Sequence, residues 1–363
     1  MHDVFPGSRI LVLLFVALAI VACGGGSDES SQNDDQQDHR LRVVTTVSPI
    51  TSIVENIGGR RIRLEGVVPE GVNSHTFEPT PSMAKLMADA DLIIINGLFL
   101  EEPTLALAEA NKKAEAVILS LGDQSVTPDE WQFDFTFPES AGHPNPHLWP
   151  DPNLGLRYSE LVHDQLAAMD PDNATYYAGN LERFRSLVSQ MDQAIRVAVA
   201  TVPEENRKLL TYHDSWAYFA KQYGMEVIGA VQPSNFSQPS VREVAELIDQ
   251  VRELGLPAVF GSRVFSSDVL EAIAGEADAQ FIDELADDDL PGKPGDLQHT
   301  YLGLMQQNLA AMIPALGGDA AAVAALDTGN VFDGDSGAVY QQYEGVNHLS
   351  TPTIISPGQH HHH

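Results

Sequence analysis

The chain has 363 residues, 43% of them hydrophobic, which is enough for about two domains with buried cores. Its formal net charge is −31, from 20 basic and 51 acidic residues. This charge argues against a nucleic-acid-binding protein, because phosphate binding needs clustered Lys and Arg. An acidic chain can attract cations through its long-range field, although a solubilising acidic surface explains most of these charges better.

The N-terminal segment is expected to export and anchor the protein. A basic residue precedes the apolar run "ILVLLFVALAIVA", which is shorter than the roughly 20 residues of a membrane span and fits a signal peptide over 1–22. The run ends in "IVAC", which resembles the lipobox of bacterial lipoproteins, although Val21 stands where a small residue is common. We therefore expect a lipidated Cys23 and a flexible tether over 23–40. An ordinary signal peptide with an incidental cysteine is the alternative.

From residue 41 to about 170, short apolar runs alternate with helical segments. This alternation favours a parallel sheet built from βαβ units, here an N-terminal α/β lobe over 41–170. One run, "DLIIING", is apolar throughout, which is typical of a strand covered on both faces. The expected strands are "LRVVTTV", "RIRLEGVV", "DLIIING" and "EAVILSL".

A long helix is expected to join this lobe to a second one. Apolar and aromatic residues recur at spacings of three and four from Tyr177 to Val199, and Gly179 is the one Gly or Pro between Asn173 and Val199. Such a helix, in a linker over 171–202, would be roughly 40 Å long at 1.5 Å per residue. Because one stiff helix resists a wide hinge motion, we expect the two lobes to be linked rigidly.

The same alternation restarts after Pro203 and predicts a second α/β lobe over 203–316. Its longest helix, "SVREVAELIDQVRELG", is expected to be capped by Ser240. The segment 317–363 is rich in Ala, Gly and Asp with weak periodicity, so we expect a poorly ordered tail, and its terminal histidines are typical of a purification tag. The expected strands of the second lobe are "RKLLTY", "MEVIGAV", "PAVFG" and "DAQFID".

Three histidines and one aspartate lie in loops that follow the expected strands. His75 lies a few residues past "RIRLEGVV", His213 directly follows "KLLTY", and Asp283 directly follows "QFI". His147 lies in the Pro-dense loop "HPNPHLWPDP" after the last strand of the first lobe. Ligands of open parallel sheets bind outside the carboxyl ends of the strands. A cleft between the lobes would therefore bring all four side chains together.

Three imidazoles and one carboxylate suit a borderline divalent cation such as zinc. Four protein ligands fill a tetrahedral shell, whereas a hydrolytic zinc keeps one position open for water, so the set favours holding a metal over catalysis. Taken singly, His75 and His147 could simply pack within their loops. His213 could cap a helix, and Asp283 could belong to a solvated acidic loop. The equivalent placement of all four residues favours the joint hypothesis.

Several motifs together resemble the zinc- and manganese-binding solute receptors of bacterial ABC importers. The resemblance covers roughly 43–316, and "SHTFEPTPS" combined with "PHLWPDP" is its most specific part. It implies two α/β lobes joined by a rigid helix, and capture of a divalent metal outside the membrane for delivery to a permease. It also implies metal ligands at His75, His147, His213 and Asp283. The other motifs are "TTVSPITSIVENIGG", "YYAGNLERF", "LLTYHDSWAYFAKQYG" and "FIDELADDD" followed by "TYLGLMQQN".

The resemblance leaves zinc or manganese as the cargo. An imidazole at His213, in place of a carboxylate, favours zinc, and so do the relative affinities of first-row metals. The His-rich loop of many zinc receptors is missing before His147, where His143 is the one candidate accessory ligand. The expected protein is a monomer, lipid-anchored on the extracytoplasmic face of a membrane, with an ABC permease and no nucleic acid as partner.

Two other classes of protein could use the same ligands. A metal-dependent hydrolase would replace His147 or Asp283 by water and use Glu78 or Asp214 as a base. A surface adhesin or structural lipoprotein would use the metal only to tie the lobes together. An open coordination position would favour the hydrolase, and tightly bound metal that is never transferred would favour the structural protein.

Overall fold

A computed structural model describes residues 39–264 and 268–342 of the chain. The expected signal peptide over 1–22, the lipidated Cys23 and the segment 343–363 lie outside the described residues. In the described part, no helix is both long enough and apolar enough to cross a membrane.

The first lobe contains a four-stranded sheet in the order β2-β1-β3-β4, with every pair of neighbours parallel. All four residues of β3 are buried, as expected for a central strand covered on both faces. The strands are β1 (Leu41–Thr45), β2 (Ile62–Gly66), β3 (Leu92–Ile95) and β4 (Val117–Ser120). The helices are α1 (Ser48–Gly58), α2 (Pro81–Asp89), α3 (Glu102–Asn111), α4 (Leu121–Ser125) and α5 (Pro152–Met169), with short 3-10 turns η1 (Gly59–Arg61), η2 (Ser74–Thr76), η3 (Glu139–Ala141) and η4 (Pro171–Asn173).

The second lobe repeats this topology in a parallel sheet of order β6-β5-β7-β8. Ser240 caps its longest helix as expected, in a capping box with Glu243. The strands are β5 (Lys208–Thr211), β6 (Glu226–Ala230), β7 (Ala258–Ser262) and β8 (Gln280–Leu285). The helices are α7 (Ala217–Tyr223), α8 (Val241–Leu254), α9 (Asp268–Ala277), α10 (Tyr301–Ala315) and α11 (Ala321–Ala324), with a 3-10 turn η5 (Glu204–Asn206) before β5.

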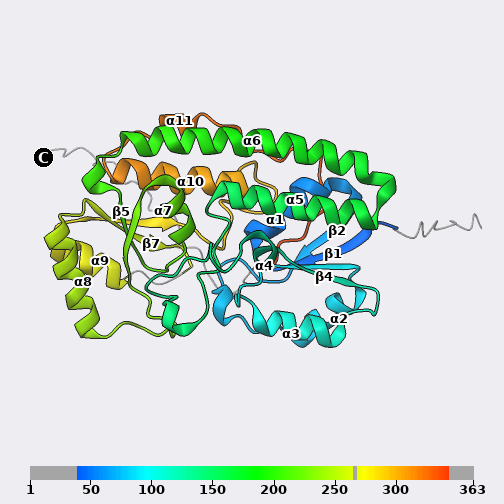
Figure 1. Cartoon of the computed structure of the whole chain (residues 1–363), viewed down its shortest axis with the longest axis horizontal. Helices are drawn as coiled ribbons and strands as arrows, with labels where there is room; N and C mark the ends of the chain where they lie inside the picture. Colours follow the sequence, from blue (N-terminus) through cyan, green and yellow to red (C-terminus); the bar gives the residue numbers. More distant parts are fainter. Residues whose placement is uncertain (1–38, 265–267, 343–363) are drawn as a thin grey trace, which may run out of the picture. The chain divides into compact units, whose positions relative to one another are not determined.

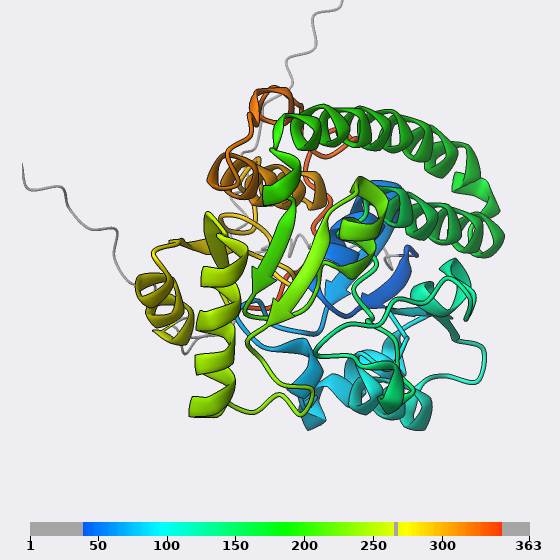
Figure 2. The ribbon, with the colours of Figure 1, turned by 60° about the vertical axis from the view of Figure 1, so that its left-hand side comes forward.

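Successive residues of the second sheet face two different cores, because side chains alternate along a strand. Leu210 and Val259 belong to a cluster with α8 and α9, which lie beside the strands in Figure 2. Leu209 and Phe260 face the other way, into the large cluster that contains α6 and α10. The second sheet is therefore covered on both faces, like the first.

Helix α6 (Ala174–Thr201) holds the two lobes together. Its 28 residues span about 42 Å at 1.5 Å per residue. It contacts α1 and α5 of the first lobe and α7 and α10 of the second (Figure 1). Its apolar side chains belong to one buried cluster that also includes Ile93 of β3 and Phe260 of β7. Because the lobes share this core, separating them would expose apolar surface, so packing and helix together make the link stiff.

The residues after α10 do not form the poorly ordered tail that their composition predicts, at least as far as residue 342. Helix α11 packs on α6 and α10. Residues 329–342, which we call the C-terminal strap, then return to the first lobe and lie along the outer edge of β2. The Gly66 N–H donates to the Val339 carbonyl at 2.9 Å, and the Val339 N–H donates to the Leu64 carbonyl at 3.0 Å. The strap is held by backbone pairing, which leaves no hydrophobic periodicity in the sequence.

Candidate metal centre

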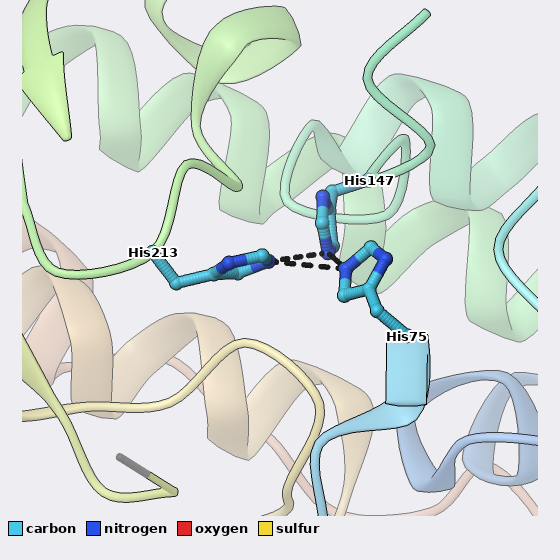
Figure 3. Close-up of side chains that lie close together, drawn as sticks. All are labelled: His75, His147 and His213. Atoms are coloured by element: carbon cyan, nitrogen blue, oxygen red, sulfur yellow. Dashed lines mark hydrogen bonds between the residues drawn. The ribbon is translucent and has the colours of Figure 1, made fainter. Parts of the chain in front are cut away.

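Three histidine side chains from separate loops meet at one point (Figure 3). His75 lies in η2 after β2, His147 in the loop before α5, and His213 two residues after β5. The Nε2 atom of His75 lies 3.1 Å from Nε2 of His147 and 3.2 Å from Nε2 of His213, and the latter two are 3.1 Å apart. In the part of the chain that the structure describes, this is the one group of three or more His, Cys, Asp or Glu side chains close enough to share a metal ion.

His147 is oriented by Asn145, two residues earlier in the Pro-rich loop. The Asn145 amide nitrogen donates to Asp134 Oδ2 at 2.5 Å and to the Asp214 carbonyl at 2.6 Å. These contacts fix the amide, so that its Oδ1 faces the histidine and accepts from the His147 backbone N–H and from Nδ1, both at 2.8 Å. An amide oxygen can only accept. Nδ1 of His147 therefore carries the proton, and Nε2 presents a lone pair.

His213 has an equivalent partner in the second lobe. Its Nδ1 lies 2.7 Å from Oε1 of Gln232, a buried residue just past β6. The amide oxygen again requires a proton on Nδ1 and leaves Nε2 as the acceptor. Hydrogen bonds of this kind are the usual way in which proteins orient metal-binding histidines.

The arrangement of the three nitrogens suits a bound cation better than it suits hydrogen bonds among the histidines. Lone pairs that face one another at 3.1 Å have no hydrogen between them. Burial, with a smaller contribution from His213, lowers the pKa of His75 and of His147 well below the ordinary 6.5, so both rings stay neutral. Zinc–nitrogen bonds of about 2.0–2.1 Å at tetrahedral angles place the nitrogens about 3.3 Å apart. The observed separations of 3.1–3.2 Å are close to that geometry.

The choice of Asp283 as the fourth ligand is corrected by the structure. Strand β8 continues past Asp283 to Leu285, and Asp283 is an exposed side chain within the strand, outside the histidine cluster. The carboxyl end of β8 is instead followed by Asp287, which is 5% exposed. Asp287 Oδ2 lies 4.0 Å from His213 Nε2. The strand predicted from the sequence ended at Asp283, two residues before the observed end of β8 at Leu285.

Hydrogen bonds from the first lobe hold the segment that carries Asp287. The Trp149 indole N–H donates to the Asp287 carbonyl at 2.8 Å, so the loop of His147 is tied to this segment. The Ser74 hydroxyl donates to Asp288 Oδ2 at 2.5 Å, which ties the turn of His75 to it as well. The loops of both lobes that carry the candidate ligands are thus fixed to one another.

The other residues considered from the sequence have different roles. His143 is exposed and stacks on Phe99 with ring centroids 3.8 Å apart, away from the three Nε2 atoms. Asp214 Oδ2 accepts the backbone N–H groups of Phe135 and Thr136 at 3.0 and 3.3 Å and so holds that segment in place. Glu78 is exposed. His213 and Asp287 lie at the ends of strands, where sheet topology delivers them together.

Comparisons with known proteins place this geometry in context. Residues 43–315 match the family described as "Zinc-uptake complex component A periplasmic". The manganese-binding lipoprotein MntA of Halalkalibacterium halodurans is 28% identical over 305 residues, which are 84% of this chain and 97% of that protein.

Solved structures share the fold and its extent. The periplasmic zinc-binding protein TroA of Treponema pallidum superposes with a TM-score of 0.70 at 25% identity, covering 76% of this chain and 99% of that one. A structure of ZnuA gives a TM-score of 0.65 at 26% identity, covering 77% and 99%. Each superposition thus leaves about a quarter of the present chain uncovered.

Proposed function

The chain belongs to the family of periplasmic zinc-uptake components, and from this premise we propose that its three convergent histidines capture zinc. It is an extracytoplasmic receptor that binds a divalent metal ion and delivers it to the permease of an ABC importer. The family consists of binding receptors rather than enzymes. The metal is therefore cargo.

One observation carries the proposal: three buried or half-buried Nε2 atoms lie within 3.1–3.2 Å of each other. Two of them are held as lone-pair donors by amide oxygens. The His147–His213 pair is unfavourable without a cation, because two lone pairs face each other at 3.1 Å with no hydrogen between them. A divalent ion at the centre would satisfy all three nitrogens at once.

Asp287 is proposed as the fourth ligand. Its Oδ2 lies 4.0 Å from His213 Nε2, too far for a hydrogen bond. This separation is about twice a zinc–ligand bond of roughly 2.0 Å, so an ion could lie between the two atoms. Asp287 would then complete a tetrahedral shell of three nitrogens and one oxygen.

Zinc is proposed over manganese because of these donors. Three imidazoles and one carboxylate make a nitrogen-rich set, which suits zinc, whereas manganese prefers oxygen-rich sets. The similar proteins do not decide between the metals, since MntA is named for manganese and TroA for zinc. Attachment through a lipidated Cys23 is proposed as well, and the lipoprotein name of MntA supports it.

Metal analysis of the exported domain tests the proposal. The protein would start after Cys23 and lack His360–His363, so that the terminal histidines cannot bind metal. We expect one zinc per chain, and a melting temperature that rises with added zinc because the ion binds only the native state. A melting temperature that does not change in excess zinc would contradict the proposal.

Matched alanine variants test the assignment of the ligands. His213→Ala removes one of the three nitrogens, and we expect zinc affinity to fall at least 100-fold in a chelator competition titration. His163→Ala is the control, because His163 lies on α5 and pairs with Asp164 at 2.9 Å, outside the cluster. Tighter binding of manganese than of zinc would overturn the choice of metal while leaving the receptor function intact.

A further inference from the structure

His75 differs from the other two histidines in how it is held. Nδ1 of His147 and of His213 each bonds to an amide oxygen. Among the described residues, no hydrogen bond to Nδ1 of His75 is present. The backbone N–H of His75 donates to Oδ1 of Asn73 at 3.0 Å, but this bond does not involve the ring. The ring of His75 is therefore free of the hydrogen bond that fixes its partners.

Two phenylalanine rings pack against the imidazole ring of His75 and restrict its position. Phe236 stacks on His75 with ring centroids 4.8 Å apart and planes 21° apart. Phe137 packs at 5.4 Å with planes tilted by 40°. Phe137 comes from the first lobe, like His75, whereas Phe236 comes from the loop between β6 and α8 of the second lobe. The position of the His75 ring thus depends on a side chain from across the lobe boundary.

Phe236 is held in an unusual backbone conformation. Its φ is +56°, in the left-handed region that non-glycine residues rarely adopt. Such residues persist where the surrounding structure imposes them, and they occur often at ligand clamps and switch regions. The residues on either side, Asn235 and Ser237, are exposed. The ring is therefore carried by a strained loop that has little packing around it.

The same two rings line a cavity beside His75. A cavity of about 320 Å³ is lined by His75, Phe137 and Phe236, together with Phe99 and His143, and neither His147 nor His213 lines it. His147 is 0% and His213 2% exposed. Of the three candidate ligands, His75 is the one that an incoming or departing ion in this cavity would meet.

We propose that Phe236 is a gate and a positioning residue for the metal: its ring holds His75 in place, and the metal enters and leaves when this ring moves aside. The inference rests on the proposed metal-binding function. Its physical basis is that the lobes share one core through α6, so a local motion of the loop between β6 and α8 exposes far less apolar surface than separation of the lobes. His75 is then the ligand that releases first.

Rates of metal release test this gate. Zinc-loaded protein is mixed with excess chelator in a stopped-flow instrument, and release is followed for the wild type, Phe236→Ala and Phe236→Tyr. We expect Phe236→Ala to raise the dissociation rate constant about tenfold or more without slowing association, while the stoichiometry stays at one zinc. Phe236→Tyr keeps the stacked ring, so its rate should stay within twofold of the wild type.

Phe99→Ala is the matched control. Phe99 lines the same cavity and has the same left-handed backbone, with φ of +66°, but it stacks on His143 instead of His75. The inference is overturned if Phe236→Ala releases zinc within twofold of the wild-type rate, or if Phe99→Ala accelerates release equally. A wild-type protein that binds no zinc would instead overturn the proposed function, so the two failures are distinguishable.

Discussion

Gln232 determines which nitrogen of His213 faces the metal centre. Its Oε1 accepts the Nδ1 proton at 2.7 Å, and the residue is 4% exposed, so no water competes readily for this bond. Without the acceptor, His213 could place its proton on Nε2, where it would block the metal. A side chain outside the histidine cluster thus sets the tautomer of a candidate metal ligand.

Substitution of Gln232 tests this role. Gln232→Leu keeps a side chain of similar size but removes the acceptor, and we expect zinc affinity to fall about 10- to 100-fold, the usual effect of losing such a partner. Gln232→Glu keeps an acceptor for Nδ1, so its zinc affinity should stay close to that of the wild type. Competition titrations with a zinc chelator measure both variants. Equal losses in the two would show that the acceptor is not what matters.

Asp287 and Asp283 provide a second test at the scale of single residues. We expect Asp287→Ala to weaken zinc binding at least tenfold, because it removes the proposed oxygen donor beside His213. Asp283→Ala changes an exposed side chain of β8 and should leave affinity within twofold. Isothermal titration measures both. Loss of affinity in Asp283→Ala alone would restore the ligand set first expected from the sequence.

At the scale of elements, Glu101 joins β1, β3 and the start of α3. Its carboxylate accepts from the Thr46 hydroxyl at 2.8 Å and from the backbone N–H groups of Asn96 and Gly97 at 2.7 and 3.2 Å. Asn96 in turn donates to the Pro146 carbonyl at 2.9 Å, one residue before His147. This buried carboxylate therefore supports the loop that presents a candidate ligand.

The pKa of Glu101 predicts how stability depends on pH. Burial raises this pKa from 4.5 to about 7. Between these values the native state holds a proton that the unfolded chain has lost, so the free energy of unfolding falls as pH rises through this window. The Glu101 contribution to this fall is up to about 3 kcal/mol at 1.36 kcal/mol per pKa unit.

Glu101→Gln should remove that part of the pH dependence. Urea unfolding of both proteins at pH 5 and pH 8, in the absence of metal, measures the difference. We expect the wild type to lose more stability between the two values than the variant loses. Parallel curves would mean that Glu101 does not change its protonation in this range.

At the scale of the whole molecule, the C-terminal strap returns to the first lobe and bonds to it. The Tyr340 hydroxyl donates to Glu55 Oε2 at 2.7 Å and the Ser336 hydroxyl to Oε1 at 2.5 Å. Glu55 is only 7% exposed. Without the strap, this carboxylate would lose both partners, and the edge of β2 would lose its backbone pairing.

Two truncations separate the strap from the residues beyond it. A chain that ends at residue 328 should melt at a clearly lower temperature than the full chain, because it loses the bonds to Glu55 and to β2. A chain that ends at Gln342 keeps the strap and should melt within a degree or two of the full chain. Scanning calorimetry without metal compares them. A strap-free chain of unchanged stability would contradict this account.

The sequence by itself determined the two parallel lobes, the long helix and the three histidines. Alternating apolar runs specify strands and helices locally. Parallel strands place the residues after them at a common edge, so the proximity of His75, His147 and His213 was predictable. Ser240 was readable as a cap because the capping signal is local as well.

Only the tertiary structure showed which aspartate lies beside His213, where the strap runs and that Phe236 stacks on His75. The end of β8 depends on its pairing with β7, so its sequence did not separate Asp283 from Asp287. The strap packs by backbone bonds to a strand more than 250 residues earlier, and such pairing leaves no periodic pattern. Contacts between segments distant in sequence depend on the assembled fold. Helix and strand propensity and burial patterns, in contrast, depend on neighbouring residues and can be recognised in the sequence.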